Sequence, residues 1–260
     1  MLATATAHHG VGLSFIAAVV AAGFGAGLFN GVAGGGTMLS FPTLLALGIS
    51  PITANISSTI GILPGYLTSI HGFRQEISQQ RHQLRRLIVP AVGGGIVGAA
   101  LLLTTSPAVF NVLVVVLVGL ATLLFALQPL LAKAMGRAST KVEHRVAVVV
   151  GVTVTSLYGG YFGAGMGIML LVVFGLTLPI SLAESSGLRS VLSIMVNALA
   201  ALIFLLRGTP NWVAVACLAP GSLVGGYVGA HLAKRLPTIW LRVTVVAIGV
   251  ITTAVLAAKA

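Results

Sequence analysis

Long apolar segments separated by short polar ones make up most of this 260-residue chain. The apolar segments cover about 11–30, 37–49, 52–72, 87–104, 108–131, 145–161, 165–178, 183–206, 211–232 and 238–258. A helix needs about 20 residues to cross a bilayer, and most of these segments reach that length. The pattern therefore predicts an all-α polytopic membrane protein with about 8–10 membrane segments.

Two of the apolar segments, 37–49 and 165–178, are short, and each follows a cluster of glycines. Before the first of them, residues 31–37 read Gly-Val-Ala-Gly-Gly-Gly-Thr. Irregular backbone at membrane depth has to lie inside protein or line a cavity. A helix that restarts after such a break directs its N–H groups and positive dipole end at that place, which suits an anion. We expect broken helices at a binding site; the alternative is that small residues let helices pack closely.

The glycine pattern occurs twice. Three glycines of the first cluster recur 129 positions later, so that Gly31, Gly34 and Gly36 match Gly160, Gly163 and Gly165. The sequence of residues 94–99 is also repeated, with one difference, at residues 225–230. Such self-similarity predicts two structural repeats, about 11–131 and 145–258, within a single transmembrane domain of residues 1–260.

The basic residues indicate how the repeats are oriented. The polar loops 73–86 and 132–145 are both basic, and the uncharged turn 104–107 lies between them. In the second repeat the turn that matches 104–107 is the basic one, Lys234-Arg235. Positive loops face the cytoplasm, so this exchange predicts an inverted topology with both termini outside. Inverted repeats built around broken helices are common in secondary transporters.

Composition supports the membrane assignment and excludes other classes. The chain is 57% hydrophobic and 7% charged, which does not suit a soluble domain. The net charge of +11 does not indicate nucleic-acid binding, because eight of the fourteen basic residues lie in the two basic loops. Cys217 is the only cysteine, and no histidine spacing suits a metal. With no nucleophile beside a plausible base either, we expect neither an enzyme nor a cofactor.

Two ionisable residues, Glu184 and Arg189, lie in an otherwise apolar part of the second repeat. Ionisable groups within a membrane are costly and indicate function. Arg189 offers a fork of donors to an anionic substrate, and Glu184 is the candidate for binding a coupling proton. The alternative is that the two residues pair with each other, if the helix is irregular near Gly187.

The predicted substrate-binding residues come from the two glycine motifs and the polar runs that follow them. They are Gly34, Gly35, Gly36, Thr37, Asn55, Ser57, Ser58, Thr59, Gly163, Gly165, Gly167, Ser185, Ser186 and Arg189. Their hydroxyls either donate to substrate oxygens or bond to backbone carbonyls of their own helix, and the sequence leaves both readings open.

The motif at 31–36, followed by Pro42, Leu44, Ala54 and Ser57-Ser58, resembles the signature of the TauE/SafE family. These are sulfite and organosulfonate exporters, also called the toluene sulfonate uptake permease group. Pro90 with the glycines of 94–98 fits the same pattern, and residues 159–186 echo it. The second copy departs from the signature: it has no proline that matches Pro42, and it carries Glu184 and Arg189.

The resemblance implies a secondary transporter in the bacterial inner membrane that exports a small sulfur oxyanion, such as sulfite, sulfoacetate or another organosulfonate. Its partners would be a small anionic substrate, the lipid bilayer and a coupling proton or ion, with no nucleic acid. Whether the chain forms a homo-oligomer stays open. So do two alternative functions, a passive anion channel and a non-transporting membrane subunit that assembles a partner.

Overall fold

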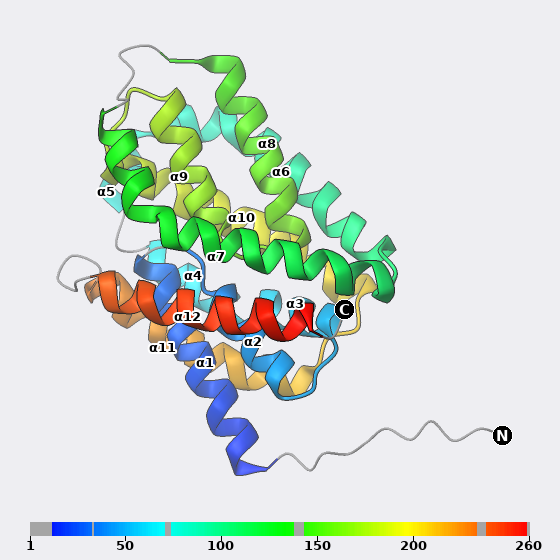
Figure 1. The fold of residues 1–260 in the computed structure, drawn as a ribbon. Coiled ribbons are helices and arrows are strands. Elements are labelled where there is room, and N and C mark those ends of the chain that lie inside the picture. Colours follow the sequence, from blue (N-terminus) through cyan, green and yellow to red (C-terminus); the bar gives the residue numbers. More distant parts are fainter. Residues whose placement is uncertain (1–11, 33, 71–73, 138–142, 233–237, 259–260) are drawn as a thin grey trace.

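The structure, a computed structural model, describes residues 12–32, 34–70, 74–137, 143–232 and 238–258, and in these ranges all regular structure is helical. The helices are α1 Leu13–Val32, α2 Thr37–Ala46, α3 Pro51–Gly61, α4 Leu63–Ile70, α5 Arg74–Gln79, α6 Arg81–Thr104, α7 Pro107–Arg137, α8 Arg145–Tyr161, α9 Met166–Thr177, α10 Leu182–Arg207, α11 Trp212–Leu232 and α12 Thr238–Ala257 (Figure 1). The all-α prediction is confirmed.

Five helices of the described chain are long and apolar enough to cross a membrane. They are Leu13–Gly31, Arg81–Thr104, Pro107–Leu131, Leu182–Arg207 and Trp212–Gly229. Shorter apolar helices cover Thr37–Ala46, Met166–Thr177 and Val243–Ala257. These lengths confirm a multi-pass membrane protein.

The helix breaks predicted at the glycine clusters are present in both halves of the chain. Between α1 and α2, Gly34 has φ 74°. Between α8 and α9, Gly163 and Gly165 have φ 81° and 78°. Side chains make this left-handed backbone costly, so glycine is the residue that allows the chain to turn here. The short helices α2 and α9 follow these turns, as the short apolar segments predicted.

Two predicted boundaries were wrong. The apolar segment 52–72 is not one helix, because it divides at Ile62 into α3 and α4. Pro64 lies in the first turn of α4, where the missing N–H is tolerated, while the same ring would disrupt a continuous helix. The polar loop expected at 73–86 is largely helical, because α5 begins at Arg74 and α6 begins at Arg81. Its Gln and Arg residues have good helix propensity.

The two halves of the chain are interleaved. The most extensive packing joins α1 to α11 and α6 to α8, followed by α4 on α11 and α10 on α6. Helices α7 and α12 lie side by side across the middle of the molecule (Figure 1). Each of these pairs takes one helix from each expected repeat. The inverted relation between the repeats stays a prediction.

Small residues allow the closest of these helix pairs to form. A Cβ at Gly225 would overlap the carbonyl oxygen of Phe24, and one at Gly98 would overlap that of Leu157. These contacts join α11 to α1 and α6 to α8. Close packing therefore explains many of the chain's glycines, as the alternative reading proposed, but it does not explain those with positive φ.

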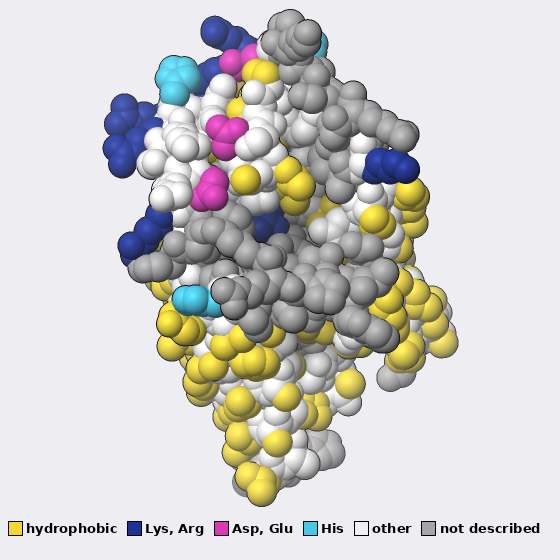
Figure 2. Space-filling view, turned by 90° about the vertical axis from the view of Figure 1, so that its left-hand side faces the viewer, with side chains coloured by type: hydrophobic (Ala, Val, Ile, Leu, Met, Phe, Trp, Pro, Cys, Tyr) yellow, Lys and Arg dark blue, Asp and Glu magenta, His cyan; other side chains and the backbone are white. Residues whose placement is uncertain are grey.

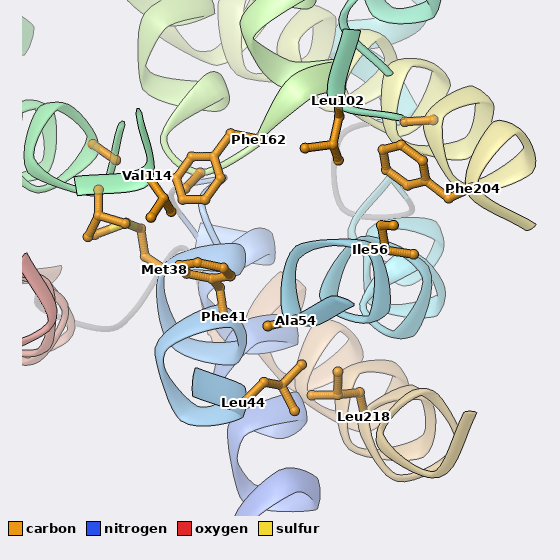
Figure 3. Packing of buried hydrophobic residues seen from close by; sticks show 14 of the residues in the cluster. Met38, Phe41, Leu44, Ala54, Ile56, Leu102, Val114, Phe162, Phe204 and Leu218 are labelled. Carbon is orange, nitrogen blue, oxygen red and sulfur yellow. The ribbon is translucent and has the colours of Figure 1, made fainter. Parts of the chain in front are cut away.

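A hydrophobic cluster continues through both halves. Phe41 of α2 meets Phe162, which follows α8, edge to face with ring centroids 5.1 Å apart. Figure 3 shows these rings beside Met38, with Ile56 and Phe204 nearby. The two glycine turns are thus held next to each other by buried aromatic packing.

Charged side chains gather on one part of the surface. Figure 2, which looks at the left-hand side of Figure 1, shows lysine, arginine and acidic side chains on the upper part and hydrophobic side chains below. Among the described residues, Arg86 forms an ion pair of 2.6 Å with Glu143. This pair joins the start of α6 to the segment before α8, so the two basic regions of the sequence lie close together.

Candidate functional site

The two glycine turns meet inside the protein, although they are 129 residues apart in the sequence. A methyl group added at Gly167 would lie 3.0 Å from Gly34 Cα. One added at Gly163 would lie 3.7 Å from Thr37 Oγ1 and 3.6 Å from Asn197 Oδ1. Sequence analysis named four of these five residues as binding candidates. The structure brings them together where α2 and α9 begin.

Arg189 of α10 lies beside the first turn. It is only 2% exposed, and its Nε and Nη1 atoms have no hydrogen-bond partner. A methyl group added at Gly34 would lie 3.0 Å from Arg189 Cζ, so the guanidinium packs directly against the glycine backbone. An arginine at this position keeps its charge. An isolated buried charge is expensive, which makes this guanidinium the strongest feature of the site.

None of the chain's three acids neutralises Arg189. Glu143 pairs with Arg86, and Glu184 accepts a hydrogen bond from Gln80 at 2.6 Å. The ion pairs Arg86–Glu143 and Arg145–Glu143 include neither Glu76 nor Arg189. The pairing of Glu184 with Arg189 that the sequence left open is therefore not observed. The guanidinium therefore has none of the three acids as a counter-ion.

A small cavity lies against the guanidinium. It is lined by Asn30 of α1, Gly34, Tyr66 of α4, and three residues of α10, Arg189, Ser190 and Ser193. Its volume of about 10 Å³ is close to the minimum for one water molecule. The cavity is therefore smaller than an oxyanion in this structure.

The neutral groups of the cavity are mainly hydrogen-bond donors. Asn30 Oδ1 already accepts from the Gly36 N–H at 2.7 Å, which leaves Asn30 Nδ2 without a partner. Ser193 Oγ also has no partner. Ser190 Oγ donates to Ser186 O at 2.8 Å, so it can act only as a hydrogen-bond acceptor toward the cavity. A cation surrounded by unpaired donors suits an anion that offers several oxygens.

The spacing of polar residues on α10 explains how one helix supplies half of this site. Arg189, Ser193 and Asn197 are four residues apart and therefore lie along one face of the helix. Asn197 Nδ2 donates to Ser193 O at 2.8 Å, and its Oδ1 remains unpaired. This face points at both glycine turns.

Several predicted binding residues lie away from the cavity and join helices instead. Asn55 Nδ2 donates to Tyr161 O at 2.9 Å, and Ser57 Oγ accepts from the Asn211 N–H at 2.8 Å. Ser58 forms a short hydrogen bond with Ser40. The polar run of α3 therefore connects α3 to α2, to the end of α8 and to the residue before α11. For these positions the structural reading fits the observed contacts.

The remaining predicted residues are also outside the cavity lining. Gly35 packs under the ring of Phe125, and Gly165 packs against Ala121. Ser186 Oγ donates to Leu182 O at 2.8 Å within its own helix. Thr59 and Ser185 are buried without lining the cavity.

Glu184 occupies a different position from the one expected. It is partly exposed and forms a capping box with Ser181 at the start of α10. Its Oε2 atom accepts from the Ser181 N–H at 2.8 Å, while Gln80 donates to Oε1. These bonds stabilise the helix terminus. A role of Glu184 in proton coupling stays a prediction, without the burial on which it was based.

Sequence reasoning missed four of the cavity residues: Asn30, Tyr66, Ser190 and Ser193. Asn30 carried a signal, since it is a lone amide in an apolar segment, four residues before Gly34. Tyr66 and the two serines carried none, because many serines and tyrosines of membrane helices bond only to the protein itself.

Comparison with known proteins agrees with this architecture. The profile of the family described as "Sulfite exporter TauE/SafE" matches residues 19–256. The chain belongs to this family. A "Probable membrane transporter protein" of Haemophilus influenzae is 22% identical over 225 residues, covering 85% of this chain and 86% of its own. "Probable membrane transporter protein YfcA" of Escherichia coli K12 is 27% identical over 212 residues, covering 81% and 76%.

A third relative, "Probable membrane transporter protein ORF9" of a Sinorhizobium species, is 25% identical over 230 residues, covering 87% of this chain and 84% of its own. No solved structure matches the chain significantly. The resemblance stated from the glycine motifs is confirmed. The protein is a multi-pass membrane transporter and not an enzyme.

Proposed function

We propose that this protein is a secondary transporter of a small sulfur-containing oxyanion, such as sulfite or an organosulfonate, and that the cavity at Arg189 is its binding site. The observation that carries the proposal is the buried guanidinium, 2% exposed, whose Nε and Nη1 atoms have no partner. A fork of two N–H groups matches two oxygens of one sulfite or sulfonate group. The family description, which names sulfite export, supports the same chemistry.

The geometry supports a carrier more than an open channel. The cavity has room for about one water molecule, so the described structure holds no wide aqueous space at the proposed site. Gly34 of the first turn lines the cavity, and Gly167 beside the second turn packs against Gly34. Left-handed glycines allow the short helices α2 and α9 to change direction. Opening the cavity alternately to the two sides of the membrane is then the mode of transport.

The other parts of the proposal follow from the family and from the charge pattern. Transport takes place in the bacterial inner membrane, in the direction of export, and uses a proton or ion gradient. Glu184 is the acid nearest in sequence to the site and is the proposed proton-binding residue. The basic ends of α5, α6 and α8 face the cytoplasm.

The test is the flux of radiolabelled sulfite into proteoliposomes, with and without a pH gradient. Saturable flux that responds to the gradient is expected for the wild type. Arg189→Gln should remove it, while Arg207→Gln, the same change at the exposed end of the same helix, should not.

Two results would contradict the proposal. Flux that does not saturate and ignores the gradient would indicate a passive channel. No flux from folded wild-type protein, together with a partner that co-purifies with it, would indicate a non-transporting subunit.

A further inference from the structure

We propose that the site selects oxyanions that carry a single negative charge and discriminates against dianions. The inference rests on the proposed function and narrows its substrate class. It favours bisulfite and simple monosulfonates such as methanesulfonate over fully deprotonated sulfite, sulfate and sulfoacetate.

The charge count of the cavity is the first reason. Among the six lining residues, Arg189 alone carries a charge. A monoanion bound to it forms a neutral pair, whereas a dianion leaves one uncompensated negative charge. The surroundings offer no second charge to stabilise it, because the other five lining residues are neutral. An uncompensated charge in such a setting costs several times more than one in water.

The placement of the acids and bases is the second reason. The acids that pair or bond with neighbours, Glu143 and Glu184, do so at the charged end of the molecule and not at Arg189. The bases Arg86 and Arg145 lie within ion-pair distance of Glu143. No lining residue supplies a second positive charge that could neutralise the second negative charge of a dianion.

The hydrogen-bond pattern is the third reason. Asn30 Nδ2 and Ser193 Oγ, both without a partner, supply neutral donors beside the two free guanidinium atoms. Ser190 differs from them, because its hydroxyl hydrogen is engaged by Ser186 O at 2.8 Å. Its lone pairs can therefore accept a hydrogen. The set matches an anion with two bare oxygens and one protonated oxygen, as in bisulfite.

A consequence for energy coupling follows. If bisulfite is the form bound, the proton crosses the membrane on the substrate itself, and no carboxylate at the cavity is needed to carry it. In that case the proposed proton-binding role of Glu184 is not required, and its capping box with Ser181 is its remaining function.

The experiment is competition against radiolabelled sulfite flux in proteoliposomes, at matched ionic strength, with methanesulfonate, sulfate and sulfoacetate. Methanesulfonate should compete at least about tenfold better than either dianion, because only the dianions bring an unpaired charge into the site. The apparent KM for total sulfite should rise as the pH passes upward through the second pKa of sulfurous acid. The inhibition constant of methanesulfonate, which does not titrate there, should stay unchanged.

A binding measurement supports the flux assay. Each anion is added to purified protein, and thermal unfolding is compared between the wild type and Arg189→Gln. The variant corrects for the general stabilisation that sulfate gives to any folded protein. A wild-type-specific increase with methanesulfonate and none with sulfate is expected.

The outcomes separate the two proposals. Equal competition by sulfate, sulfoacetate and methanesulfonate in the wild type, together with no sulfite flux in Arg189→Gln, would overturn the monoanion inference and leave the oxyanion transporter standing. If none of the anions competes, and Arg189→Gln transports sulfite as the wild type does, both proposals are wrong.

Discussion

Replacing Arg189 with methionine should make the ligand-free protein more stable while abolishing transport. The side chain is 2% exposed, and two of its donor atoms are unsatisfied. Each unsatisfied buried donor costs about 1–3 kcal/mol, so two of them cost about 2–6 kcal/mol. Methionine keeps the apolar stem and removes the donors and the charge. Some packing around the guanidinium is lost, so we expect a net gain of about 1–4 kcal/mol in the free energy of unfolding.

The assay is thermal unfolding of purified protein in detergent without added anion. A gain of this size raises the Tm of a domain of this length by several degrees, since about 1 kcal/mol corresponds to about 2–4 °C. Adding a transported anion at about a hundred times its Kd should stabilise the wild type by about 2.7 kcal/mol and the variant not at all. Arg207→Met, at the exposed end of α10, is the matched control and should leave both quantities unchanged.

One result would refute this reasoning. If Arg189→Met has a lower Tm than the wild type in the absence of anion, the guanidinium is satisfied in the folded protein. Its charge would then not be available to a ligand, and the site would have to be sought elsewhere.

Three further predictions use other parts of the structure. Gly34→Ala should destabilise the protein by about 1–2 kcal/mol through backbone strain, and it should abolish transport because the added methyl group displaces the cavity guanidinium. Gly48 has a similar φ with open space around it, so Gly48→Ala should show the strain alone and keep its flux. Thermal unfolding and sulfite flux of the two variants check this. Asn30→Asp keeps an acceptor for the Gly36 N–H and adds a negative counter-charge for Arg189, so it should raise the Tm and block flux. Undiminished flux would contradict this. The hydrogen bond from Arg86 holds the pKa of Glu143 below its usual 4.5. The resulting stabilisation is present above that value and is lost as the pH falls through the lowered pKa, so Glu143→Gln should be less stable by under about 1 kcal/mol at neutral pH and equal to the wild type in acid.

The sequence predicted Arg189 and a run of polar residues on another helix as binding residues, and the structure places Arg189 at the cavity and the polar run away from it. Asn55, Ser57 and Ser58 were predicted to face the substrate, and in the structure they bond to backbone and to Ser40. Which side of a helix faces a cavity depends on its rotation against its neighbours. In an apolar helix that is buried almost all round, hydropathy contains no record of that rotation.

Glu184 shows a signal that was present and not used. Ser181 and Glu184 form the Ser-x-x-Glu pattern of a capping box just before an apolar run, and the structure has that box. The interpretation of Glu184 as an ionisable group inside the membrane predicted a proton-coupling role instead.

What the sequence determined by itself are the properties that depend on local chemistry. Hydropathy and segment length gave a multi-pass helical membrane protein, and glycine clusters gave the two helix breaks, because backbone with positive φ is cheap only for glycine. Tertiary structure alone decided that the two breaks meet, that Arg189 lies against Gly34 without a counter-ion, and that Asn30, Tyr66 and Ser193 complete the cavity. These contacts join α1, α4 and α10, and only the packing of those helices sets the distances between side chains so far apart in the chain.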